Sequence, residues 1–361
     1  MAIIKLAVDE FMALAANNIV LDVRSEGEFE YAHIPNAYSL PLFNNDERKV
    51  VGTTYKQQSR EEAVKIGLQY FGPKMLTMLQ NVESICKKRN TTYTGKETLL
   101  VHCWRGGMRS AGVAWLLDLY GFKVYTLVGG YKAYRNWVLQ QFNKPYSFQI
   151  IGGFTGSGKT KMLHQLQKRG CSIVDIEAIA NHKGSTFGAI GLPAQPSQEM
   201  FENILANSLL QAKENTKNKS LPYIFIEDES QRIGSVNIPK PLFEQMRQQK
   251  VFFLDIPFEE RLKYIVSDYG KHQQSDLVNA IVRIKKKLGG LDAKQAIHFL
   301  LEDDVYNCFK ILLNYYDKLY NIGLNKRNNV YEQVCTIQCN HVDANENATA
   351  VLQTLSASYN Q

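Results

Sequence analysis

Short apolar runs alternate along this chain with stretches in which apolar residues recur every three or four positions. The runs at 18–25, 98–103 and 124–130 are rich in Val, Leu and Ile, and they predict three buried parallel strands. Residues 110–121 carry apolar side chains at helical spacing and end in glycine, which predicts a helix. Strands that alternate with helices indicate an α/β sheet whose functional loops follow the carboxyl ends of the strands.

A second set of strands begins after a short polar stretch at 142–147, where a proline and its polar neighbours predict a linker. Apolar runs at 172–176, 221–228 and 251–257 predict further strands, and residues 259–320 have a mostly helical pattern. We therefore expect two α/β domains, the first spanning residues 1–142 and the second spanning residues 147–361 with a helical C-terminal part.

The composition excludes several classes of protein. The 361 residues are 45% apolar and 21% charged, as in globular proteins, and no apolar run of about eighteen residues predicts a membrane span. The N-terminal segment lacks the features of a secretory signal, and six cysteines without paired spacing indicate free thiols, so we expect a cytoplasmic protein with no membrane partner. Cys335, Cys339 and His341 are too few ligands for a structural zinc site.

The net charge of +7 is concentrated in residues 1–150, which hold 18 Lys or Arg and 13 Asp or Glu. A basic excess favours a polyanionic partner such as RNA. Basic clusters such as those at 87–89 and 285–287 are also common on solvated faces, so the charge alone leaves RNA binding open.

The loop after the predicted strand at 98–103 has the composition of an anion-binding loop around a cysteine. Cys103 ends the strand and Ser110 starts the helix, and glycines between them allow successive backbone N–H groups to point at one spot. The helix N-terminus adds positive charge, and Arg105 and Arg109 could add two further cations, which favours the thiolate. Arg105 could instead point outward. The alternative is a buried structural cysteine. We predict Cys103 and Arg109 as catalytic residues and the remainder as the anion loop: Trp104, Arg105, Gly106, Gly107, Met108 and Ser110.

A second anion loop follows the apolar segment at 148–151. The stretch "GFTGSGKT" fits the pattern G-x4-G-K-[ST] and precedes a helical segment, which is the context that a phosphate-binding P-loop requires. Its backbone N–H groups can wrap a diphosphate, Lys159 supplies a cation, and Thr160 can reach Mg²⁺. The pattern predicts a phosphate ligand but not ATP hydrolysis. The predicted phosphate-binding residues are Gly153, Thr155, Gly156, Ser157, Gly158, Lys159 and Thr160.

Acidic residues at strand ends are candidates for the companion of the P-loop. Glu227, Asp228 and Glu229 follow one strand and Asp175 follows another, so any of them could hold Mg²⁺ or position a nucleophile. A solvated acidic strand end is an equally good interpretation, and the metal stays unassigned. Arg232 follows closely and is a candidate anion ligand.

Two stretches of the first domain resemble rhodanese domains, namely "LDVRSEGEFEYAHIPNAYSLPL" at 21–42 and "GFKVYTLVGGYKAYR" at 121–135. The resemblance implies that the loop cysteine carries a chalcogen. Sulfur-carrying rhodaneses have C-x4-R, whereas this loop is C-x5-R, as in related phosphatases that cradle a full phosphate. A loop that handles both a chalcogen and a phosphate would explain the extra residue. Asp22, Arg24 and His33 are expected to order neighbouring loops.

The order of "VHCWRGGMRS", "GGFTGSGKT" and "IEDESQRIG" resembles the tRNA 2-selenouridine synthases over the chain up to about residue 320. The resemblance implies action on the wobble 2-thiouridine in the anticodon loop of tRNAs for lysine, glutamate and glutamine. Geranyl diphosphate first alkylates the sulfur, and selenium from selenophosphate then replaces the S-geranyl group. It further implies that Cys103 bears selenium, that no cofactor is tightly bound, and that the selenophosphate-producing enzyme is a candidate partner.

A wobble base is single-stranded and can stack on an aromatic side chain, for which Trp104 is the candidate. Tyr131, Tyr134 and Trp137 are expected in the core. Two other functions stay open. A cysteine-dependent phosphatase would cleave aryl phosphates without tRNA, and a sulfurtransferase or nucleotide-gated sulfur carrier would leave tRNA nucleosides unchanged.

Overall fold

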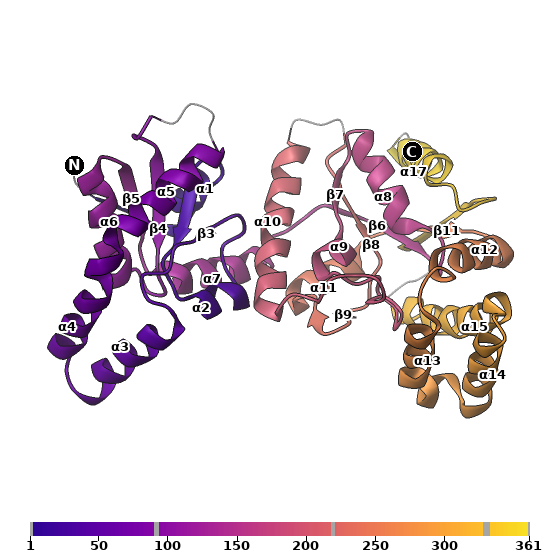
Figure 1. Ribbon diagram of the computed structural model, residues 1–361. Helices are drawn as coiled ribbons and strands as arrows, with labels where there is room; N and C mark the ends of the chain where they lie inside the picture. The colour runs from indigo at the N-terminus through magenta and orange to yellow at the C-terminus, as the bar shows by residue number, and fades with distance from the viewer. Residues whose placement is uncertain (1–2, 90–93, 218–220, 328–332, 360–361) are drawn as a thin grey trace. The chain divides into compact units, whose positions relative to one another are not determined.

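The computed structural model describes residues 3–89, 94–217, 221–327 and 333–359. It forms two compact units, Met1–Gln141 and Phe142–Gln361. Each unit contains a parallel sheet with helices packed against it, so the predicted α/β class with two sheets is confirmed (Figure 1). No described helix is both long and apolar enough to cross a bilayer.

The first unit is built on a five-stranded sheet with the strand order β1-β5-β4-β2-β3, in which every neighbouring pair is parallel. All four residues of β2 are buried, as are the last four of β4, which fits strands covered on both faces. The strands are β1 (Ile4–Leu6), β2 (Ile19–Asp22), β3 (Tyr38–Ser39), β4 (Thr98–His102) and β5 (Lys123–Leu127). The α-helices are α1 (Val8–Ala15), α2 (Glu26–Tyr31), α3 (Asn45–Gln57), α4 (Arg60–Phe71), α5 (Met75–Arg89), α6 (Met108–Tyr120) and α7 (Gly130–Gln141).

Two glycines determine where strand β5 ends, and the apolar pattern predicts this end at the wrong residue. The predicted strand at 124–130 ends at Leu127, because Gly129 and Gly130 have φ values of +73° and +60° and turn the chain into α7. A Cβ at Gly130 would lie 2.3 Å from the Cys103 carbonyl oxygen. This close approach packs the turn against the loop after β4, so the glycine pair supports the cysteine loop.

The second unit contains a five-stranded parallel sheet in the order β12-β11-β6-β8-β7 and a small antiparallel hairpin of β9 and β10. The strands are β6 (Phe148–Gly153), β7 (Ser172–Val174), β8 (Ile224–Glu227), β9 (Arg232–Ile233), β10 (Val236–Asn237), β11 (Val251–Asp255) and β12 (Val334–Gln338). The helices named below are α8 (Lys159–Lys168), α9 (Ile176–Ala180), α10 (Gln198–Thr216), α11 (Lys240–Gln248), α12 (Phe258–Tyr269), α13 (Gln274–Leu288), α14 (Gly290–Leu301), α15 (Val305–Leu324) and α17 (Ala344–Tyr359).

The predicted helical part is confirmed as helices α12 to α15, which share a core of their own that includes Leu277, Ile281, Phe309 and Leu312. The stretch after residue 324 adds edge strand β12 beside β11, and α17 packs against α8. The expected linker at 142–147 differs from a plain exposed segment, because Phe142 and Tyr146 within it are buried.

A buried arginine ties the helical part to the P-loop. Arg261 on α12 is 3% exposed, and its guanidinium donates to the Thr155 carbonyl oxygen of the loop at 3.1 Å. The same group makes two hydrogen bonds to the carboxylate of Asp317 on α15, at 2.9 and 2.7 Å. A buried guanidinium requires such partners, so α12, α15 and the loop hold one another in place.

We expect Asp317→Ala to lower the free energy of unfolding of the second unit by about 3 kcal/mol, because it leaves the buried Arg261 charge without its partner. Urea unfolding of the full chain, monitored by far-ultraviolet circular dichroism, measures the change in the free energy of unfolding. Lys263→Ala, which breaks the exposed pair with Glu260, is the matched control and should leave the transition unmoved. An Asp317→Ala transition at the wild-type urea concentration would contradict the assignment.

Candidate functional site

The thiol of Cys103 is buried and contacts a backbone N–H and a serine hydroxyl of its loop. Cys103 is 3% exposed, and its Sγ accepts from the Gly107 N–H at 3.3 Å and lies 3.2 Å from Ser110 Oγ. Burial opposes ionisation, but the hydrogen bonds from Ser110 and the charge of Arg109 outweigh it and hold the pKa of the thiol below its usual range. The thiol is therefore polarised as a nucleophile needs.

Arg109 is held beside this loop by an acidic residue that the sequence analysis missed. Its Nη1 donates to Glu28 Oε2 at 3.1 Å, and Arg48 Nε contacts the same oxygen at 2.8 Å. Although partial burial raises the pKa of Glu28, the charge of Arg109 and hydrogen bonds more than compensate and keep it ionised. Glu28 lies 81 residues before Arg109, so no local pattern links the two.

Asp22, Arg24 and His33 have the structural roles that were expected. Arg24 and Asp22 form a buried ion pair at 2.6 Å, and Arg24 Nη2 also donates to the Ala32 carbonyl oxygen. The Arg24 guanidinium lies 3.7 Å from the centre of the Tyr131 ring. His33 stacks on a phenylalanine ring at 3.9 Å and its Nδ1 contacts the Phe29 carbonyl oxygen.

The aromatic residues near the cysteine differ in exposure. Trp104 is 36% exposed within the loop, and Arg105 is exposed as well, which confirms that this arginine points outward. Tyr131 and Tyr134 are buried, as expected, whereas Trp137 is half-buried and donates its indole N–H to Asp9. Trp104 is thus an aromatic surface at the loop, available to a planar ligand.

The P-loop has the expected position between β6 and α8. Gly156 and Gly158 have φ values of +84° and +69°, and a Cβ at Gly156 would lie 2.7 Å from Ile265 on α12. Lys159 Nζ donates to the Gly153 carbonyl oxygen at 3.0 Å, so the lysine folds back over the loop. The Gly153 N–H donates to the hydroxyl of Tyr320 on α15. These contacts leave the residues from Thr155 to Thr160 lining one cavity.

Three glutamates face this loop. One carboxylate oxygen each from Glu177, Glu227 and Glu229 lies within 4.8 Å of the others, and Thr160 Oγ1 donates to Glu177 at 3.1 Å. Burial and the neighbouring Glu229 carboxylate raise the pKa of Glu177 to about 8, against the opposing charge of Lys159. Burial and carboxylate repulsion also raise the pKa of Glu227 and Glu229. Glu177 lies on α9, and sequence analysis did not identify it.

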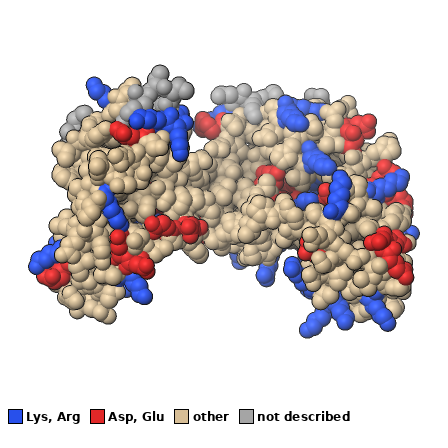
Figure 2. Space-filling view, viewed as in Figure 1, with Lys and Arg blue, Asp and Glu red and all other residues tan. Residues whose placement is uncertain are grey.

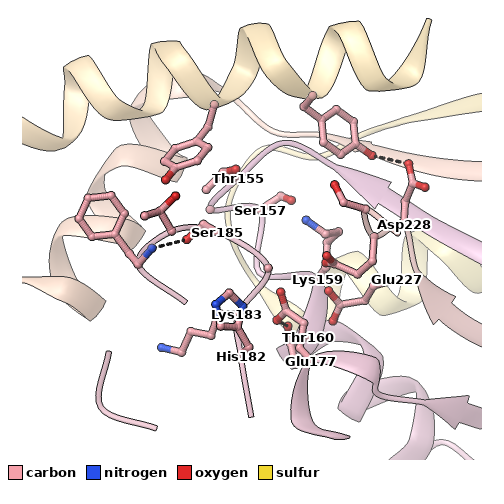
Figure 3. Close-up of a pocket in the computed structure, with 18 of the residues that line it drawn as sticks. Thr155, Ser157, Lys159, Thr160, Glu177, His182, Lys183, Ser185, Glu227 and Asp228 are labelled. Carbon is pink, nitrogen blue, oxygen red and sulfur yellow. Dashed lines mark hydrogen bonds between the residues drawn. The ribbon is translucent and has the colours of Figure 1, made fainter. Parts of the chain in front are cut away.

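The carboxylate cluster fits a divalent cation. Glu227 is 2% exposed and its Oε1 has no hydrogen-bond partner among the described residues. An unpaired buried carboxylate oxygen is costly, and hard cations such as Mg²⁺ prefer oxygen ligands of this kind. Figure 3 shows Lys159, Thr160, Glu177 and Glu227 gathered on the same side of the cavity. Glu177, Glu227 and Glu229 are therefore the residues that would hold such an ion.

The other predicted polar residues have different roles. Asp228 lines the cavity but bonds Arg327 and Tyr320 instead of the loop lysine. Asp175 lines the cavity as well, caps α9 through the Ala178 N–H, and pairs with a histidine. The structure does not place Arg232 among the lining residues; it is exposed on β9 and donates to the Gly234 carbonyl oxygen.

The cavity combines the phosphate loop with apolar walls. Its volume is about 1170 Å³, and the walls opposite the glutamates come from α12, α15 and the loop around Ser185 (Figure 3). Tyr320 on α15 touches the P-loop, and Phe309 on the same helix lies eleven residues before it, roughly 16 Å along the helix axis. Between them the lining residues Leu312, Leu313 and Tyr316 share one helix face. The cavity thus extends from an anion site into an apolar region.

The surface charges indicate a binding face less clearly than the two loops do. On the face drawn in Figure 2, acidic and basic side chains of the described residues are interspersed over both units. The basic excess of the sequence is therefore not gathered into one patch on that face.

Comparisons with known proteins identify the family of this chain. A family model for the rhodanese-like domain matches residues 7–136, and a model for the tRNA 2-selenouridine synthase AAA domain matches residues 146–343, more than half of the chain. The chain belongs to the tRNA 2-selenouridine synthase family. A family member from Bdellovibrio bacteriovorus is 33% identical over 88% of this chain and 92% of its own. A member from Hydrogenovibrio crunogenus is 32% identical over 88% of this chain and 93% of its own.

The two family models follow one another along the chain in the same order as the two units. Among solved structures, the N-terminal domain of a protein described as ATP/GTP binding from Clostridium difficile 630 is 40% identical over 38% of this chain and 99% of its own, with a TM-score of 0.33.

We expect Ser110→Ala to raise the pKa of Cys103, because it removes a donor from the thiolate. A hydrogen bond to a charged group is worth about 1.5 kcal/mol, so alkylation of Cys103 at neutral pH should slow roughly tenfold. The pH dependence of iodoacetamide labelling, read by mass spectrometry of the Cys103 peptide, measures this. Thr126→Ala removes another buried hydroxyl of the unit and serves as control. An unchanged midpoint in Ser110→Ala would refute the role of the serine.

We expect the carboxylate cluster to make the second unit less stable as the pH rises. A carboxyl with a folded pKa near 8 and an unfolded pKa near 4.5 stabilises the fold below pH 4.5, and this contribution is lost as the pH rises through 8. Mg²⁺ should restore stability more at pH 8 than at pH 5.5, because binding then displaces fewer protons.

Thermal unfolding of the full chain at both pH values, with Mg²⁺ or with a chelator, tests this cluster. Glu227→Gln should flatten the pH dependence and reduce the Mg²⁺ shift, whereas Glu244→Gln on the exposed face of α11 should not. Equal pH slopes and equal Mg²⁺ shifts in wild type and Glu227→Gln would show that the cluster does not bind the cation.

Proposed function

We propose that this chain replaces the sulfur of wobble 2-thiouridine in tRNA with selenium, through an S-geranyl intermediate. The substrates are geranyl diphosphate, selenophosphate and the anticodon loops of tRNAs for lysine, glutamate and glutamine. The observation that carries the proposal is the pairing, in one family member, of a polarised cysteine in an anion loop with a P-loop cavity that has apolar walls. An enzyme that supplies selenophosphate is the partner that this chemistry requires.

The first step is assigned to the second unit. The thiouridine sulfur attacks the first carbon of the geranyl group, so that a C–S bond forms, the C–O bond to diphosphate breaks, and the N3 proton of the base is released. Lys159, Thr160 and the loop N–H groups are suited to hold the departing diphosphate, and the apolar wall along α15 is suited to the geranyl chain. A divalent cation held by Glu177, Glu227 and Glu229 would supply further positive charge for the diphosphate.

The second step is assigned to the first unit. The selenium of selenophosphate attacks C2 of the alkylated base, a C–Se bond forms, and the C–S bond breaks to release geranylthiol after protonation. Water then attacks phosphorus, the P–Se bond breaks with its electron pair on selenium, and phosphate leaves. Alkylation assists because the geranylthiol group is a better leaving group from C2 than the unalkylated sulfur of 2-thiouridine. The Cys103 loop is suited to this step because its N–H groups and Arg109 favour anions, and Trp104 offers a stacking surface for the base.

Substitutions in the two loops should separate the two steps. We expect Lys159→Ala to slow S-geranylation at least 100-fold, roughly the loss seen when a transition-state donor is removed, while pre-geranylated tRNA is still converted. Cys103→Ser should geranylate normally but form no 2-selenouridine. Nucleoside mass spectrometry after incubation with purified protein measures both products, and Lys168→Ala at the exposed end of α8 is the control.

The same measurement in cells tests the function as a whole. Cells lacking this protein should contain no 2-selenouridine until they are complemented with the wild-type chain. Selenouridine that persists without the protein would refute the proposed function. Loss of both steps in a folded Lys159→Ala protein would refute only the division of labour between the units.

A further inference from the structure

The apolar part of the P-loop cavity leads to a cluster of three aromatic rings. Helix α12 bonds the P-loop through Arg261 and ends at Tyr269, about 12 Å further along its axis. Helix α15 contacts the loop through Tyr320, and Phe309 lies roughly 16 Å back along this helix. The rings of Tyr269 and Phe309 stack with their centres 5.4 Å apart. The two helices therefore stay in contact at a position well removed from the P-loop.

The third ring, Phe187, comes from the loop that faces the two helices. Its N–H donates to the hydroxyl of Ser185 at 3.2 Å, and Ser185 lies on the other side of the cavity from Asp228 (Figure 3). The Phe187 ring centre is 5.7 Å from that of Phe309 and 6.0 Å from that of Tyr269. All three rings line the cavity, and Phe187 is only 2% exposed. Rings packed against one another in this way form a rigid wall.

A wall at a fixed distance from a phosphate-binding loop selects chains by their length. The side chains of Leu312 and Leu313 lie between the P-loop and the rings, and both are buried and line the cavity. Such a lining suits a hydrocarbon chain. Prenyl chains differ by whole isoprene units, so a chain with one more unit would have to push a ring out of its packed position.

We infer that Phe187 sets the longest prenyl chain that the cavity accepts, and that Phe309 and Tyr269 hold its ring in place; the inference rests on the proposed function. With the diphosphate on the P-loop, the wall admits the two isoprene units of geranyl diphosphate and excludes the third unit of farnesyl diphosphate. Phe187 is a specificity-determining residue, and the bonds that form and break are those of the first step described above.

A competition between two prenyl donors tests the wall. Geranyl diphosphate and farnesyl diphosphate are supplied at equal concentrations to the full-length protein and an anticodon stem-loop that contains 2-thiouridine. Nucleoside mass spectrometry gives the ratio of S-farnesyl to S-geranyl product, which reports the ratio of kcat/KM for the two donors. Both products form in one tube, so the ratio does not depend on the folded fraction of a variant. Phe187→Ala should raise the ratio about tenfold or more, and Phe187→Leu should raise it less.

Two further variants separate the wall from the core behind it. Leu312 lies one turn nearer to the P-loop than Phe309, so Leu312→Phe should shorten the apolar space. In a competition with dimethylallyl diphosphate, which has one isoprene unit, this variant should use geranyl diphosphate several-fold less than the wild type does. Phe299→Ala is the matched control, because Phe299 packs against the same helical core but is not one of the described residues that line the cavity.

The outcomes distinguish the wall from the proposed function. Wild-type ratios in both Phe187 variants would overturn the inference, as would an unchanged ratio in Leu312→Phe. Equal use of geranyl and farnesyl donors by the wild type, or an equal rise of the ratio in Phe299→Ala, would overturn it as well. In each of these cases S-geranylation still occurs and the proposed function stands. If the wild type attaches no prenyl group to 2-thiouridine, the proposed function itself fails.

Discussion

The contacts of Arg261 and Tyr320 with the P-loop are the constraint on which the second site depends. Arg261 joins α12, α15 and the Thr155 carbonyl oxygen, while the Tyr320 hydroxyl accepts from the Gly153 N–H and donates to Asp228. A buried guanidinium without these partners would be strongly destabilising, so the helices must dock where the loop is. The apolar wall and the phosphate-binding end of the cavity therefore share one rigid scaffold, and the length between them is set by α15.

The pKa of the acidic group is lowered at the cysteine loop and raised beside the P-loop, and the causes are local. At Cys103, hydrogen bonds and Arg109 surround one thiol, so the pKa falls despite burial. Beside the P-loop, three carboxylates crowd one another in a buried place with Lys159 as the nearby cation, so their pKa values rise. The first arrangement favours an anion that reacts. In the second arrangement the three carboxylates repel one another, and a bound cation would relieve this repulsion. This fits a site that is completed only when ligands bind.

The sequence predicted what short stretches determine by themselves. The P-loop and the cysteine loop are local structures built from glycines and a following helix, so their patterns specified their place in the fold. Glu177 could not be found in this way, because α9 and β8 bring it to Glu227 across fifty residues of chain. Arg261 and Glu28 act through partners equally remote in sequence. Strand β12 was missed because its five residues carry only one buried side chain and take their place from pairing with β11.

The difference between the loops follows from what each has to release under the proposed function. Diphosphate leaves from carbon, and a ring of N–H groups with Lys159 is enough, because the incoming sulfur of the base is itself the nucleophile. Selenium arrives as selenophosphate, an anion that carries both a chalcogen and a phosphoryl group. Cys103 has a lowered pKa, a neighbouring hydroxyl and an arginine one position further away than in a sulfur-carrying loop. Under the proposed function the extra residue of this loop fits an anion that is larger than a single chalcogen atom.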